Sequence, residues 1–168
     1  MKVFVPYGHV ADQANALRLQ ALGAVNGFTV YVPPAHTRQP RDVLPIARPT
    51  GFRRSRRLDP ESEEMLKASD VVLGVVGFGF SEACRLELNA AQAAGKPTIV
   101  MANPAHAELL QQLGWNVVEI DPLHPEQAES AIVQHLKAVK AKRTKEALLA
   151  FGTLALGLLV VAALAPQE

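Results

Sequence analysis

Short apolar runs alternate with segments of helical periodicity along most of this chain. The most pronounced run is Val71–Val76, which ends before Gly77 and has the pattern of a strand buried on both faces. Four more strands are predicted at Lys2–Tyr7, Phe28–Val32, Pro97–Met101 and Asn116–Ile120. Strands of this length, separated by helices, are typical of a parallel sheet.

Helical segments fill the intervals between these strands. Ser81 has the position of a helix N-cap, and Gly95 has that of a helix stop. The predicted helices cover Asp12–Ala24, Leu58–Ser69, the stretch between Ser81 and Gly95, Asn103 to about Leu113, and a segment from Pro125 onward. The alternation predicts an α/β fold in which a five-stranded parallel, flavodoxin-like sheet carries helices on both faces. Ligands of such sheets bind beyond the carboxyl ends of the strands.

The end of the chain changes the pattern. Five basic residues occur at positions 137–145, and Ala147–Ala165 follows with no charge and with Thr153 as its one polar side chain. This length and composition predict a transmembrane helix over 147–165, after an α/β domain at 1–136 and a basic juxtamembrane helix at 137–146. The expected localisation is a single-pass membrane protein with its N-terminal domain in the cytoplasm. The alternative is an apolar helix that packs within the protein or against other copies.

Composition excludes several classes of function. A net charge of +1 gives no electrostatic bias toward nucleic acid, so no nucleic-acid partner is expected. The single cysteine, Cys84, excludes an internal disulfide and a multi-thiolate metal site. The five histidines are scattered without an i, i+4 pair, so no metal site is predicted.

A long basic loop separates the second strand from the next helix. Seven arginines lie between Arg38 and Arg57, among several prolines. Guanidinium groups suit phosphates and carboxylates, so Arg41 is a candidate contact for a pyrophosphate. A solvated basic loop and a local ion pair of Arg41 with Asp42 are the alternatives.

Three patches resemble the Toll/interleukin-1 receptor (TIR) domain family. Val3–Asp12 (VFVPYGHVAD) is similar to its first strand and loop, and Arg41–Pro45 (RDVLP) resembles its second box. The stretch KASDVVLGVV followed by SEACRLEL, within residues 67–88, resembles its third strand and the helix after it. The chain departs from the family pattern at Pro6, Ile46 and Ala83, and these departures also admit the related nucleoside 2-deoxyribosyltransferase-like family.

The resemblance implies chemistry at an N-glycosidic bond. For the TIR family this is cleavage of the nicotinamide–ribose bond of NAD, with NAD as substrate and no cofactor, and Glu87 matches the glutamate of the catalytic members. Catalytic TIR domains act as assemblies, which implies a homo-oligomer when the protein is active. Many TIR domains have no activity, so two alternatives stay open: a signalling scaffold at the cytoplasmic membrane face, and a nucleotide-sensing domain that controls a membrane helix.

The candidate site residues follow from the same loops. Glu87 is the candidate catalytic carboxylate, and a solvated helix carboxylate is its alternative. Gly8 and His9 follow the first strand, while Ser81 and Cys84 begin the helix that carries Glu87. The Ser81 end of that helix could hold a phosphate or ribose oxygen. The alternatives, which the residue types favour, are that Ser81 is a plain N-cap and that Cys84 is a core residue. Tyr7, Phe78 or Phe80 could stack on a base or pack in the core.

Overall fold

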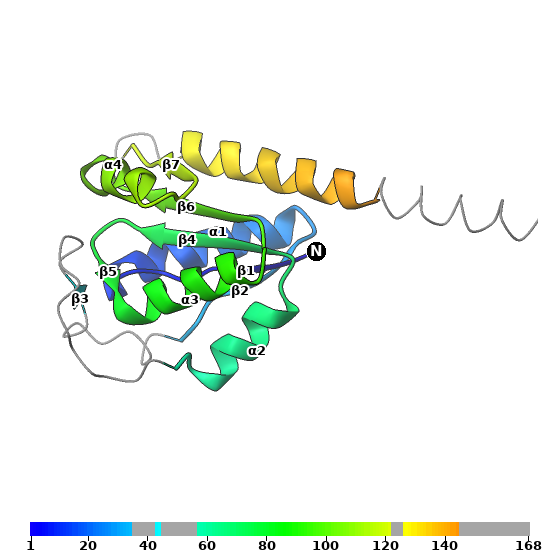
Figure 1. Cartoon of the computed structure of the whole chain (residues 1–168). Coiled ribbons are helices and arrows are strands. Elements are labelled where there is room, and N and C mark those ends of the chain that lie inside the picture. Colours follow the sequence, from blue (N-terminus) through cyan, green and yellow to red (C-terminus); the bar gives the residue numbers. More distant parts are fainter. Residues whose placement is uncertain (35–42, 45–56, 122–125, 145–168) are drawn as a thin grey trace, which may run out of the picture. The chain divides into compact units, whose positions relative to one another are not determined.

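The computed structural model describes residues 1–34, 43–44, 57–121 and 126–144, and it divides the chain into the units Met1–Ala131 and Ile132–Glu168. In the described part of the first unit, five strands form a parallel sheet in the order β2-β1-β4-β6-β7 (Figure 1). Their bounds are Lys2–Phe4 for β1, Thr29–Tyr31 for β2, Val71–Val76 for β4, Thr98–Ala102 for β6 and Val117–Glu119 for β7. The predicted five-stranded, flavodoxin-like α/β fold is thereby confirmed.

Helices follow the strands as the periodicity predicted. They are α1 at Gln13–Val25, α2 at Pro60–Ala68, α3 at Glu82–Ala93, α4 at Pro104–Gln112, and a helix over residues 126–144. A short 3-10 turn, η1 at Val10–Asp12, precedes α1. The N-caps Asp59, Ser81 and Asn103 each accept a backbone N–H of the helix that they open, which satisfies one donor that the helix leaves unpaired.

The core is built on β4, in which every residue is buried. On one face Val72 and Val76 pack in a cluster with α2, α3 and α4, where Leu66, Leu88 and Leu110 supply the largest aliphatic side chains. α1 covers the opposite face (Figure 1). This arrangement explains why the β4 sequence is apolar throughout and does not alternate.

A second, two-stranded sheet was not predicted. β3 (Val43–Leu44) pairs antiparallel with β5 (Phe80–Ser81), with Val43 opposite Ser81 and Leu44 opposite Phe80. The sequence indicated a loop at residues 78–80, because two residues carry too little pattern to identify a strand. The pairing brings part of the second TIR-like patch next to the start of α3.

The predicted membrane localisation is contradicted. Across the described ranges, no helix combines the length and the apolar character that crossing a bilayer requires. Residues 147–165, for which the transmembrane helix was predicted, lie outside those ranges. The predicted domain boundaries at 136 and 146 are not tested by the structure.

Candidate functional site

The topology places a candidate site between β1 and β4. The chain leaves β1 on one side to form β2 and returns on the other side to form β4, so the strand order reverses between these two neighbours. Their carboxyl ends lead into residues 7–12 and 77–81. In open parallel sheets, such a reversal is where ligands bind.

Asp12 joins these two segments through its side chain. Its carboxylate accepts the backbone N–H of His9 at 3.1 Å, of Gly77 at 3.0 Å and of Phe78 at 3.2 and 3.3 Å. The residue is fully buried. Asp12 therefore closes the 3-10 turn after β1 and also holds the loop after β4.

The two segments touch closely enough to require glycine. A Cβ built on Gly8 would lie 1.8 Å from the Gly79 carbonyl oxygen, and one built on Gly77 would lie 2.5 Å from an Asp12 carboxylate oxygen. Backbone hydrogen bonds complete the contact, since Gly8 donates to Val75 at 2.7 Å and Ser81 donates to Gly8 at 2.9 Å. The glycines thus allow a backbone approach that any side chain would block.

Burial dominates the ionisation of Asp12. It raises the pKa of the carboxyl to about 6, while the N–H donors of Phe78, Gly77 and His9 and the charge of His9 lower it. The hydrogen bonds thus offset only part of the cost of removing this carboxylate from water.

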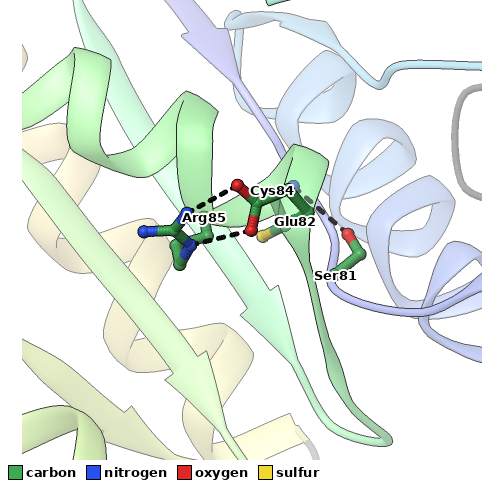
Figure 2. Close-up of polar contacts among 4 residues, drawn as sticks. All are labelled: Ser81, Glu82, Cys84 and Arg85. Carbon is green, nitrogen blue, oxygen red and sulfur yellow. Dashed lines mark hydrogen bonds and ion pairs between the residues drawn. The ribbon is translucent and has the colours of Figure 1, made fainter. Parts of the chain in front are cut away.

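The start of α3 is buried and well capped. The Ser81 hydroxyl accepts the Cys84 N–H at 3.2 Å, and Cys84 itself packs in the core. Glu82 faces a different partner: Arg85 donates to its two oxygens, at 2.5 Å from Nη2 and 3.0 Å from Nε (Figure 2). Ser81 is therefore confirmed as the N-cap, and Cys84 lies in the core that the alternative interpretation described.

Glu87 lies deeper along the same helix. It is a carboxylate with only 2 % of its surface exposed. At about 1.5 Å per residue it is about 9 Å along the helix axis from Ser81. Its charge also affects the pKa of Tyr31, the last residue of β2. Burial is the largest cause that raises the pKa of the Tyr31 phenol to about 12, and Glu61, Asp59 and Glu87 raise it further. The negative charge of Glu87 is thus one of the groups that disfavour ionisation of Tyr31.

The remaining predicted residues have contrasting environments. Tyr7 is fully buried, so its ring offers no exposed face, and its backbone forms an isolated parallel β-bridge with Val75. The His9 Nδ1 accepts the Ala11 N–H at 3.1 Å within the capping box. Phe78 is the opposite of Tyr7, with 67 % of its surface exposed. Arg41 lies outside the described residues.

Asp12 and Tyr31 belong to this region although the sequence pattern did not predict it. The helical periodicity predicted Asp12 as the first residue of a helix, but its side chain makes no cap to α1 and accepts the N–H of Gly77, 65 positions away. The available signal was an acidic residue three positions after His9, between a strand and a helix, which is the spacing of a capping box. Tyr31 carried no signal beyond strand propensity.

No group of three or more metal-ligating side chains occurs within the portion of the chain that the structure describes.

Comparison with known proteins shows the fold alone. The sequence matches no protein-family model and no curated protein. Among solved structures, the sugar isomerase domain of an RpiR transcription factor from Sphaerobacter thermophilus aligns with a TM-score of 0.53 and 12% identity, over 90% of this chain and 78% of that one. This likeness agrees with the flavodoxin-like α/β architecture and carries no activity with it.

Two further structures align less closely. A flavodoxin mutant from Pseudomonas aeruginosa has a TM-score of 0.48 and 16% identity, over 83% of this chain and 98% of that one. A CMP N-glycosidase from Clostridium botulinum has a TM-score of 0.45 and 17% identity, over 82% of this chain and 99% of that one. Similarity at this level does not bear on the function of this chain.

Proposed function

We propose that this protein cleaves the N-glycosidic bond of a nucleotide, with NAD as the first candidate substrate and Glu87 as the essential carboxylate. The observation that carries the proposal is the burial of Glu87 on the helix that starts at the β1–β4 reversal. Burying a carboxylate costs free energy, and such groups occur preferentially at functional sites. The sequence patch SEACRLEL, which resembles the TIR family, ends directly after this residue.

The reaction needs only one well-placed carboxylate. As the bond between the ribose C1′ and the pyridinium nitrogen breaks, its electron pair moves to that nitrogen, and nicotinamide leaves as a neutral molecule. Positive charge develops on the ribose, and an adjacent carboxylate stabilises it. Water then adds at C1′ and releases a proton to solvent, which gives ADP-ribose.

The residues near the reversal have corresponding roles in this proposal. The first turn of α3, which Ser81 caps, supplies N–H groups toward a phosphate or ribose oxygen, and Gly8 and His9 line the facing loop. Phe78 provides an exposed ring for a base. Arg41 remains the candidate for the pyrophosphate, and Tyr7 and Cys84 support these loops from within the core.

The test is nicotinamide release from NAD by the purified protein and by Glu87→Gln. The substitution keeps the shape and removes the charge, so we expect a fall in kcat/KM of at least about a hundredfold. Glu82→Gln is the matched control, because Glu82 is on the same helix but is partly exposed and paired with Arg85. We expect it to change kcat/KM less than about threefold.

Three outcomes decide the proposal. Loss of turnover in Glu87→Gln, with unchanged circular dichroism and with Glu82→Gln active, supports it. Equal turnover in all three proteins contradicts the role of Glu87. Because the TIR resemblance implies assembly, the assay covers a range of protein concentrations. If NAD is inert throughout, transfer of deoxyribose between nucleobases tests the related family, and no reaction there overturns the enzyme proposal.

A further inference from the structure

The loop of residues 77–79 is fixed at each of its three positions to the segment after β1. Gly77 and Phe78 donate their N–H groups to Asp12. The Gly79 carbonyl lies so close to Gly8 that a Cβ on Gly8 would clash with it. Hydrogen bonds to a charged acceptor are stronger than neutral ones. The backbone of this loop is therefore held from within, by a fully buried side chain.

Phe78 is an unusual residue to hold in this way. The residue is 67 % exposed, although its backbone N–H lies between the two oxygens of a buried carboxylate, at 3.2 and 3.3 Å. An exposed aromatic ring on a mobile loop would lose conformational freedom when it binds a ligand. A ring on a fixed backbone has lost part of that freedom already, which favours binding.

We infer that Asp12 is a positioning residue, which fixes the backbone of Phe78 so that the exposed ring forms a stacking platform for the base of the bound nucleotide. The inference deepens the proposed function and rests on it. The ligand class is an aromatic nitrogen heterocycle, a purine or pyridine, whose flat face pairs with the ring. Stacking of this kind tolerates different bases, since every base has a π face.

The Asp12 carboxylate can accept hydrogen bonds at both of its terminal atoms, which the amide of an asparagine cannot. Two acceptor oxygens receive N–H groups from both loops at once, whereas asparagine has one acceptor oxygen and an NH2 group that only donates. In Asp12→Asn, the amide nitrogen must therefore face at least one of these backbone donors. The substitution loosens the connection between the loops with little change in volume.

The test is a double-mutant cycle on NAD binding, measured by calorimetry in the Glu87→Gln protein so that turnover does not intervene. Base–aromatic stacking predicts that Phe78→Ala weakens binding about tenfold. Asp12→Asn is expected to weaken it by a similar factor. If Asp12 acts through Phe78, the double variant binds no more weakly than either single variant.

Two further variants make the cycle specific. Phe78→Tyr keeps the aromatic ring and should retain binding within about threefold. Asp70→Asn is the matched control, because Asp70 joins the amino-terminal ends of the same strands by accepting the Lys2 N–H at 2.7 Å. Asp70→Asn removes a carboxylate that also accepts a backbone N–H, but at the opposite end of these strands, and should leave NAD affinity unchanged.

Each result has a distinct meaning. Fully additive effects of Asp12→Asn and Phe78→Ala, or unchanged affinity in either, overturn the inference and leave the proposed function standing. Absence of NAD binding in every variant overturns both. If Asp12→Asn does not fold, Asp12→Glu replaces it in the cycle, because it keeps both acceptor oxygens and displaces them by one methylene. Unchanged affinity in a folded Asp12→Glu protein whose Phe78 amide exchanges faster then overturns the inference.

Discussion

At the scale of single residues, the described part of the chain holds two buried carboxylates with different surroundings. Asp12 is buried among backbone N–H donors from two loops, whereas Glu87 is buried on α3. The Asp12 carboxylate accepts hydrogen bonds that hold the backbone of these loops. Glu87 is the one for which we propose chemistry. Residue type alone did not distinguish these two roles.

Asp12 should make stability depend on pH. Its pKa is about 6 in the folded protein and near 3.8 when unfolded, so between these values the folded state binds more protons. Stability from this group is complete below about pH 4 and is lost as the pH rises through 6. By linkage the loss reaches about 3 kcal/mol at most. Urea unfolding of wild type and Asp12→Asn from pH 4 to 7.5 measures it as the difference between the two curves.

A pH-independent difference between wild type and Asp12→Asn would contradict this expectation. The common pH dependence of the other carboxyl groups cancels in the comparison. Asp70→Asn, measured in the same series, shows whether any carboxylate that accepts a backbone N–H gives the same effect.

Among the helices and strands, α3 has a structural role at its first turn and carries Glu87, the residue of proposed function, near its middle. Ser81 is only 2 % exposed and ends the short strand β5 as it caps the helix. Glu82 and Arg85 pair on the outer surface, and Cys84 and Leu88 enter the core. One helix thus fixes the loop from β4, packs against the sheet and places Glu87.

Ser81→Ala should destabilise the protein more than removal of a more exposed cap does. It leaves the buried Cys84 N–H without its acceptor, so we expect a loss of about 2 kcal/mol. The control is Asn103→Ala on α4, where Asn103 accepts the Ala105 N–H at 3.0 Å at a more exposed site. We expect about 1 kcal/mol there, measured by equilibrium denaturation. A larger loss in Asn103→Ala would show that burial of the cap does not govern its contribution.

At the scale of the whole molecule, the described part of the first unit has its central strand enclosed by helices on both faces. Close packing reaches β4 itself, where a Cβ on Gly74 would lie 3.0 Å from the Leu88 side chain. The small residue in the strand therefore makes room for the large one on α3. Interiors packed in this way respond strongly to loss of volume.

Leu88→Ala should cost about 2–5 kcal/mol of unfolding free energy, because it removes a fully buried side chain and leaves a cavity. Leu113→Ala makes the same chemical change at a position that is 56 % exposed. We expect it to cost less than about 1 kcal/mol. Guanidinium unfolding followed by circular dichroism gives both values, and equal losses would show that the core does not have the packing described.

Local patterns of residues were sufficient to predict the five strands of the main sheet, the helices between them and the Ser81 cap. These features depend on neighbouring residues, through the period of apolar positions and through side chains that bond within one turn. The same local signals led to a predicted membrane localisation that the structure contradicts, and they did not reveal the two-residue strands β3 and β5.

The assembly of the candidate site depends on contacts between residues that are distant in the sequence. The tertiary structure joined Asp12 to Gly77 and Phe78, buried Glu87 and Tyr7, and left Phe78 exposed. Such contacts span about 65 residues of chain and depend on which strands become neighbours in the sheet. The physical reason is that burial, and with it the pKa of Asp12, is a property of the packed surroundings, which periodicity along the chain does not encode.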